Sequence, residues 1–192
     1  MTSEKLAEIV GNKIALLTSY KKHFSRDAKQ KPPRKSGKKE EDLCVDVSRI
    51  DMRVDLGKDS LRTVVSSLVQ HVPIERMQGS VGIFVCNLKP VKMRGIESQG
   101  MLMCAAGAND RIEPLVIASL TDLTLGDKVY VQDYPGELDA QIHPKKKVWE
   151  QVMSDLRVDS SQIATYKGVP WKLRNNPDAI IKAPTVVDAQ IS

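Results

Sequence analysis

The sequence predicts a mainly β fold, in which a small barrel or sandwich is followed by an α+β subdomain. From residue 43 onward, short runs rich in apolar and β-branched residues recur, and glycine or proline separates them. Apolar and polar residues alternate along residues 45–54 (VDVSRIDMRV), which is typical of a half-buried strand. The number of runs in residues 43–132 fits an OB-like barrel, and residues 133–192 form the subdomain.

Residues 1–24 predict an amphipathic helix ahead of the barrel. A lone amphipathic helix cannot bury its apolar stripe, so it docks on the main domain, pairs with a partner helix or frays. The stripe recurs at three- and four-residue steps and consists of Leu6, Ile9, Val10, Ile14, Leu17, Tyr20 and Phe24.

Residues 25–42 (SRDAKQKPPRKSGKKEED) predict a basic, disordered linker. The segment has no apolar periodicity, and Pro32, Pro33 and Gly37 interrupt regular structure. Its lysines and arginines either add non-specific attraction for RNA or serve only solubility and spacing, and both interpretations stay open.

The remaining elements are assigned from their residue patterns. Further strands are predicted at residues 61–69, 80–88, 100–106, 111–117 and 127–134, with a helical turn at residues 74–77 after Pro73. In the subdomain, the patterns predict a helix at residues 143–156, a short capped helix at 159–166, and extended segments at 166–173 and 186–191.

The cysteines and the absence of known catalytic and binding motifs argue against several classes of protein. Cys44, Cys86 and Cys104 are widely spaced and form no CxxC pair, so neither a zinc site nor a disulfide framework is supported. Cys86 and Cys104 lie in apolar runs and are expected to be buried thiols in a reduced, cytoplasmic protein. The sequence has no secretory signal and no apolar run of membrane-spanning length, so no membrane partner is expected. It also lacks motifs for a cofactor, a metal or a catalytic nucleophile, so neither a cofactor nor an enzyme is expected.

The most informative segment is residues 83–104 (IFVCNLKPVKMRGIESQGMLMC), in which a basic, polar insert separates two apolar runs. The chain has a net charge of +5 and a pI near 9.1, which favours an anionic partner. Contacts with phosphates are made mostly by lysine and arginine. Lys89, Lys92 and Arg94 are therefore candidate RNA-binding residues, and the alternative is a solvated loop.

Two further groups of candidates accompany this insert. The side chains of Asn87, Ser98 and Gln99 either bind a sugar or a base of RNA or serve only to cap the turn. Lys145 and Lys146 begin the predicted helix, where cations oppose the helix dipole and so do not stabilise the helix. They are either part of a basic RNA-binding patch continuous with the insert or an ordinary soluble helix start.

Four segments carry a resemblance to a known family. RTVVSSLVQHVP (62–73), CNLKPVKMRGIESQGMLMCA (86–105), HPKKKVWEQV (143–152) and ATYKGVPW (164–171) resemble the tRNA-binding domain of the endothelial-monocyte-activating polypeptide II family. That family includes the p43 scaffold of the multi-synthetase complex and C-terminal extensions of some tyrosyl- and methionyl-tRNA synthetases. The resemblance implies an OB-fold barrel that binds tRNA without strong sequence discrimination, followed by an appended subdomain. The implied partners are tRNA and aminoacyl-tRNA synthetases or other proteins of the multi-synthetase complex.

The sequence departs from the family after Val54. In the family, the first strand continues into a basic loop and the chain returns along a second strand. Here Asp55 follows at once, so about twenty residues, roughly one hairpin, are missing. A barrel without this hairpin exposes sheet edges. Three outcomes stay open: the remaining chain closes differently, a partner covers the gap, or the chain is a splice form or an incomplete gene model.

Two functions are consistent with these patterns. The first is a non-catalytic tRNA-binding module that delivers or retains tRNA for aminoacyl-tRNA synthetases and binds mainly the phosphate backbone. The second is a protein-interaction or scaffold module, docked through residues 1–24, whose RNA binding is weakened by the missing hairpin. A third reading, a fragment that does not fold by itself, predicts the absence of a cooperative thermal transition.

Overall fold

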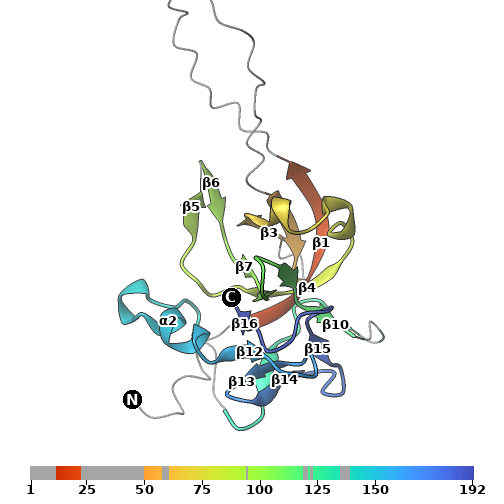
Figure 1. Cartoon of the computed structure of the whole chain (residues 1–192). Helices are drawn as coiled ribbons and strands as arrows, with labels where there is room; N and C mark the ends of the chain where they lie inside the picture. The colour runs from red at the N-terminus through yellow and green to blue at the C-terminus, as the bar shows by residue number, and fades with distance from the viewer. Residues whose placement is uncertain are drawn as a thin grey trace, which may run out of the picture.

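A computed structural model describes the backbone of residues 12–22, 50–57, 61–93, 95–118, 121, 123–134 and 139–192 (Figure 1). Side chains are described in the same ranges except at residues 12–22, Ile74 and Lys146. Antiparallel strands make up most of the regular structure, and the described residues include one short α-helix, α2 (Val148–Met153). The prediction of a mainly β fold is confirmed.

Five antiparallel strands form the first sheet, in the order β3-β2-β1-β4-β7. Two 3-10 turns, η1 and η2, connect β3 to β4, and η2 (Ile74–Arg76) is the turn predicted after Pro73. The strands of this sheet are β1 (Asn12–Lys22), β2 (Ile50–Asp55), β3 (Leu61–Ser66), β4 (Val81–Val85) and β7 (Met101–Leu102), and η1 spans Leu68–Gln70.

Strand β1 lies in the middle of this sheet, between β2 and β4. On one side Lys22 lies opposite Ile50 of β2, and on the other side Asn12 lies opposite Val85 of β4. The chain therefore pairs the facing edges of β2 and β4 without the hairpin that is missing after Val54. Strand β1 thus supplies partners for β2 and β4, while the three outcomes considered for the gap stay open.

The prediction of a helix across residues 1–24 is wrong over residues 12–22. The same stretch of sequence also places Ile14 and Leu16 two residues apart, so its local pattern permits a strand. Two open strand edges offer hydrogen-bond partners along the whole segment, whereas a single helix has to bury its apolar stripe elsewhere. Tertiary context thus overrides the helical period. The rest of the predicted helix and the predicted linker at residues 25–42 lie outside the described residues.

The two ends of the first sheet approach each other at Gln99. Its backbone N–H donates a hydrogen bond to the carbonyl oxygen of Thr63 in β3, at 2.8 Å. In the part of the chain that the structure describes, β3 and β7 are not strand partners. A closed OB-like barrel therefore stays a prediction, while the five-stranded antiparallel sheet is established.

Two chain segments cross closely where β2 ends. Gly57 and Gly126 both have a positive φ, 74° and 80° respectively. A Cβ atom placed on Gly126 would lie 2.0 Å from the carbonyl oxygen of Leu56, and one on Gly57 would lie 2.6 Å from that of Leu125. Glycine alone among the residues satisfies both the backbone angle and the spacing at this crossing.

Replacing Gly126 is expected to destabilise the fold strongly. Gly126→Ala adds the backbone cost of a positive φ, about 1–2 kcal/mol, and a collision with the Leu56 carbonyl oxygen. Gly79→Ala is the matched control, because Gly79 has a φ of 70° but no atom lies within 4 Å of the added Cβ. Thermal unfolding of both variants measures the difference. Equal losses of stability in the two variants would contradict the close crossing.

A seven-stranded antiparallel sheet packs against the first and combines strands from both sides of the predicted boundary between residues 132 and 133. Its order is β11-β14-β13-β12-β16-β8-β9, and two small sheets, β10-β15 and β5-β6, accompany it. The new strands are β5 (Val91–Met93), β6 (Ile96–Ser98), β8 (Cys104–Ala106), β9 (Ile112–Pro114), β10 (Val116–Ile117), β11 (Val129–Val131), β12 (Leu156–Val158), β13 (Ala164–Tyr166), β14 (Val169–Leu173), β15 (Ile181–Lys182) and β16 (Gln190–Ile191).

The helix predicted at residues 143–156 is interrupted. A 3-10 turn, η3 (Pro144–Lys146), precedes α2, and Lys147 between them has a left-handed φ of 48°. The short helix predicted at residues 159–166 is wrong. Its capping signal is used by a turn instead, since the Asp159 carboxylate accepts hydrogen bonds from the backbone N–H groups of Ser161 and Ile163, both at 2.8 Å.

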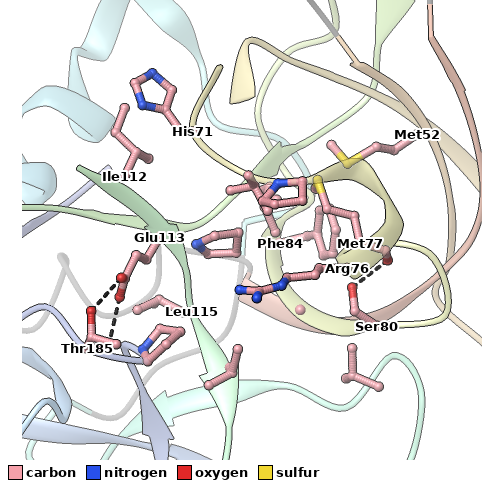
Figure 2. A pocket seen from close by; sticks show the side chains of 18 of the residues that line it. Met52, His71, Arg76, Met77, Ser80, Phe84, Ile112, Glu113, Leu115 and Thr185 are labelled. Carbon is pink, nitrogen blue, oxygen red and sulfur yellow. Dashed lines mark hydrogen bonds between the residues drawn. The ribbon is translucent and has the colours of Figure 1, made fainter. Parts of the chain in front are cut away.

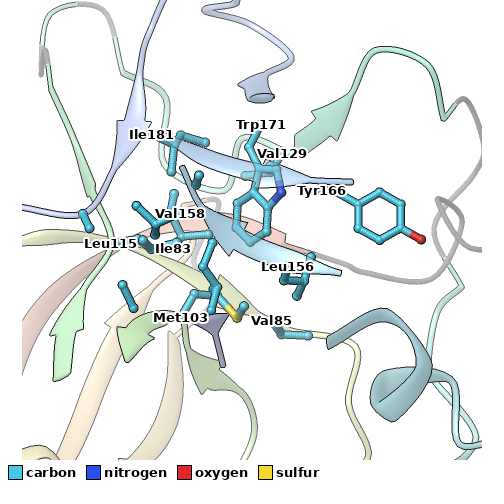
Figure 3. Packing of buried hydrophobic residues seen from close by; sticks show 14 of the residues in the cluster. Ile83, Val85, Met103, Leu115, Val129, Leu156, Val158, Tyr166, Trp171 and Ile181 are labelled. Atoms are coloured by element: carbon cyan, nitrogen blue, oxygen red, sulfur yellow. The ribbon is translucent and has the colours of Figure 1, made fainter. Parts of the chain in front are cut away.

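Strand β4 separates two apolar cores. Ile83 and Val85 point into the larger core, which also contains the buried Trp171 of β14 (Figure 3). Phe84, between them in sequence, points into the smaller core with Met52 of β2. This division follows from the two-residue period of a strand. One strand therefore ties the five-stranded sheet to the subdomain.

Cys86 and Cys104 are both buried, as predicted. They belong to the smaller core, together with Met52 and Phe84. Burial raises the pKa of the Cys104 thiol to about 12, because the thiolate loses its hydration. Cys104 is therefore a packing residue and an unreactive thiol at neutral pH.

Candidate nucleic-acid interface

The basic insert forms a hairpin that projects from the body of the protein (Figure 1). We call residues 89–98, with strands β5 and β6, the basic hairpin. Lys92 lies opposite Glu97 across its two strands, and Met93 lies opposite Ile96. Gly95 occupies the turn with a φ of 90°, a backbone angle that glycine adopts without strain.

Two side chains at the end of β6 fasten the basic hairpin to β3. The Ser98 hydroxyl accepts a hydrogen bond from the Val65 N–H and donates one to the Gly100 carbonyl oxygen, both at 3.0 Å. The Gln99 side-chain oxygen accepts a hydrogen bond from the Thr63 N–H at 3.1 Å. Ser98 is also buried. These contacts favour the structural reading of Ser98 and Gln99 over direct RNA contact.

Arg62 joins the two stems of the basic hairpin. Its guanidinium donates hydrogen bonds to the carbonyl oxygen of Cys86, which precedes β5, and to that of Gln99, which follows β6. Arginine suits this role because its planar fork presents several donors in a fixed geometry. No local sequence pattern points to Arg62, because the residues it joins lie 24 and 37 positions away.

Asn87 connects the start of the basic hairpin to the segment that leads to η3. It is 7% exposed, and its side-chain amide donates a hydrogen bond to the Asp139 carbonyl oxygen at 3.1 Å. Its own carbonyl oxygen accepts from the Ile142 N–H at 2.6 Å. Asn87 therefore orients two segments of chain, which again favours the structural reading.

The same contacts bring the second group of lysines to this side of the molecule. Residue 142 is followed at once by His143, whose ring nitrogen Nδ1 accepts a hydrogen bond from the Lys145 N–H at 3.3 Å. Lys145 and Lys147 are exposed. Figure 1 shows the turn before α2 on the same side as the base of the basic hairpin.

The structure thus sorts the predicted RNA-binding residues into two groups. Lys89, Lys92 and Lys145 have exposed side chains, while Asn87, Ser98 and Gln99 hold the backbone that presents them. The side chains of Arg94 and Lys146 lie outside the described part of the chain. Exposed lysines on a fastened hairpin can neutralise phosphates with little reorganisation.

A cavity of about 340 Å³ lies apart from the basic hairpin, between the η1–η2 connection and β9–β10 (Figure 2). Its walls include Phe84, Arg76 and Glu113. The Glu113 carboxylate accepts hydrogen bonds from the Thr185 hydroxyl at 2.6 Å and the Thr185 N–H at 2.8 Å. Arg111 forms an ion pair with the same carboxylate at 2.8 Å. Glu113 thereby fastens the C-terminal segment to β9.

Partial burial by itself raises the pKa of Glu113, but the hydrogen bonds from Thr185 and Val186 and the charge of Arg111 outweigh it. The net effect lowers the pKa below its ordinary value of 4.5. A carboxyl group with a lowered pKa in the folded state stabilises the fold above its unfolded pKa. That contribution disappears as the pH falls through the folded value.

Glu113→Gln is expected to lower the stability at neutral pH by about 2 kcal/mol, because hydrogen bonds to a charged acceptor are replaced by weaker ones. The difference between wild type and variant should shrink as the pH falls below 4.5 and the wild-type carboxylate becomes protonated. Denaturant unfolding at neutral pH and at pH values below 4.5 measures both effects. A difference that is constant with pH would show that the charge of Glu113 does not matter.

Two further features were sought among the described residues, a metal site and a membrane-spanning helix. These residues include no cluster of three or more histidine, cysteine, aspartate or glutamate side chains placed to hold a metal ion. None of the helices in the described ranges combines the length and the apolar character needed to cross a bilayer.

The chain is similar to a known protein family and to parts of several longer proteins. Residues 49–128 match the family described as "Putative tRNA binding domain". The mouse aminoacyl tRNA synthase complex-interacting multifunctional protein 1 is 37% identical over 167 residues, which cover 77% of this chain and 52% of that protein. The cytoplasmic tyrosine–tRNA ligase of Gallus gallus is 38% identical over 79% of this chain and 32% of its own length. The cytoplasmic methionine–tRNA ligase of Caenorhabditis elegans is 38% identical over 76% of this chain and 17% of its own length.

A solved structure has the same fold. The C-terminal domain of Plasmodium vivax p43 superposes with a TM-score of 0.76 at 17% sequence identity, over 98% of this chain and 99% of that domain. The chain spans about half the length of the mouse protein and smaller parts of the two ligases. The shared region is thus one part of longer proteins.

Proposed function

We propose that this chain, which carries a tRNA-binding domain related to those of complex-interacting multifunctional protein 1 and of tyrosine– and methionine–tRNA ligases, is a non-catalytic tRNA-binding module. The observation that carries the proposal is the basic hairpin, whose exposed Lys89 and Lys92 lie within the matched residues. Its two stems are fastened to β3 through hydrogen bonds that include those of Arg62, so the backbone that carries the lysines is held in place.

Binding is mainly to the phosphate backbone. Lys89 and Lys92 from the basic hairpin and Lys145 from η3 each neutralise phosphates, and the resemblance adds Arg94 and Lys146 to the same surface. Asn87, Ser98 and Gln99 act as positioning residues that hold this surface. Lysine is a flexible point charge, so such a surface accepts many RNA sequences and discriminates little among them.

The module delivers or retains tRNA for aminoacyl-tRNA synthetases in the cytoplasm. This part of the proposal is supported by the relatives, one of which is named for its interaction with the synthase complex and two of which are tRNA ligases. The alternative, a scaffold docked through a free N-terminal helix, loses support because residues 12–22 are part of the first sheet.

A filter-binding titration of the full chain with tRNA tests the proposal. The dissociation constant should rise steeply between 50 and 200 mM salt, because each neutralised phosphate releases counterions. The slope of log K against log salt gives the number of phosphates engaged. An affinity that is tight yet indifferent to salt, or no affinity for tRNA at low salt, would overturn the proposal.

A further inference from the structure

The basic hairpin has an apolar face as well as a charged one. Val91 is 59% exposed and Met93 is 40% exposed, although both are large apolar side chains. They alternate with Lys92 along β5, so they point to the opposite side of the hairpin from that lysine. Across the strands, Met93 lies beside Ile96, which extends the same face.

Among the described residues, neither apolar core includes Val91 or Met93. By contrast, Ile83, Phe84 and Val85 on the preceding strand β4 are almost completely buried. Apolar residues close to the hairpin in sequence are therefore packed into a core, whereas Val91 and Met93 are exposed. The hairpin instead projects from the body of the protein (Figure 1). An apolar pair on a projecting element is typical of a surface that becomes covered on binding.

We propose that Val91 and Met93 contact the faces of unstacked bases, so that the hairpin prefers RNA with loop nucleotides over continuous duplex. This inference rests on the proposed tRNA-binding function. The lysines hold the backbone, while the apolar face packs against bases that a loop leaves splayed out. In an A-form duplex the bases are stacked and the deep major groove excludes side chains, so the apolar face would find no partner there.

Charge decides in favour of RNA over an apolar protein surface as the occupant. Lys89 and Lys92 flank or interleave the apolar pair and are both exposed. Lys92 points away from the apolar face, and Lys89 lies two residues before Val91. An apolar protein patch would cover one face only, whereas a single RNA strand that passes over the hairpin can bring phosphates to the lysines and bases to the apolar face. A surface that combines a cationic track with packing against bases is the general form of single-strand recognition.

The test compares two probes, tRNA and a blunt RNA duplex of equal phosphate number. The variant Val91→Thr with Met93→Gln keeps the side-chain sizes and the net charge while making the face polar. It should weaken tRNA binding roughly fivefold to tenfold and leave duplex binding unchanged. The slope of affinity against salt should not change, because no phosphate contact is removed. Ile180→Thr with Val187→Thr is the matched control, since these exposed apolar residues lie in the C-terminal part of the chain.

Each other outcome has a distinct meaning. Equal weakening with both probes, or none with either, would overturn the role of the apolar face while leaving the proposed function intact. Unchanged RNA binding with loss of association to a purified synthetase would assign the face to a protein partner instead. Failure of the wild-type chain to bind either RNA would overturn the proposed function itself. Circular dichroism of each variant verifies that the fold is retained.

Discussion

Removal of residues 1–22 is expected to abolish the cooperative unfolding transition of the chain. The deletion takes out β1, the middle strand of the five-stranded sheet, and leaves the facing edges of β2 and β4 unpaired. Each backbone hydrogen bond lost with β1 contributes about 0.5–1.5 kcal/mol net. Because pairing runs along both sides of β1, the summed loss is comparable to the total stability of a typical domain, about 5–15 kcal/mol.

Circular dichroism during thermal unfolding measures this effect. A chain lacking only residues 1–11 is the matched control, because it retains the whole of β1. The control should melt cooperatively, while the longer deletion should show a broad transition and bind a dye for exposed apolar surface. A cooperative transition at the wild-type temperature in the longer deletion would mean that β1 is not part of the folded core.

The second large effect is expected at the basic hairpin. Lys89→Ala with Lys92→Ala should weaken tRNA binding at least roughly tenfold at low salt and reduce the slope of affinity against salt by about two. The fold should be unaffected, because both side chains are exposed and neither fastens the hairpin.

Lys172→Ala with Lys182→Ala removes the same net charge from β14 and β15, in the other sheets. Because these lysines are distant from the basic hairpin in the fold (Figure 1), this control variant should bind tRNA nearly as well as the wild type. Similar losses of tRNA affinity in both double variants would indicate attraction by the overall charge. They would contradict the assignment of the basic hairpin as the binding surface.

Local patterns predicted the strands well because each run carries its own signal. The alternation and β-branched residues around β2, β3 and β4 appear in the sequence, and the two-residue period explains why Phe84 and Val85 enter different cores. Strand β1 was missed for a physical reason. A segment that fits both the helical and the strand period is decided by its neighbours, and those neighbours follow it in sequence.

Part of the candidate site can be proposed from the sequence alone. Lysines in the insert were recognisable by charge, and their exposure is now established for Lys89 and Lys92. The structural use of Asn87 and Ser98 could not be inferred, because it depends on contacts with Asp139 and Val65. Residues that fasten a hairpin from distant strands leave no local signature.

Lysine footprinting by mass spectrometry tests whether the basic hairpin binds tRNA. The chain is acetylated with and without excess tRNA at low salt, and the extent of modification is compared at each lysine. We expect protection of Lys89, Lys92 and Lys145, and none of Lys172 or Lys182. Protection restricted to Lys172 and Lys182, or no protection while tRNA is bound, would contradict the assignment of the basic hairpin as the RNA-binding surface.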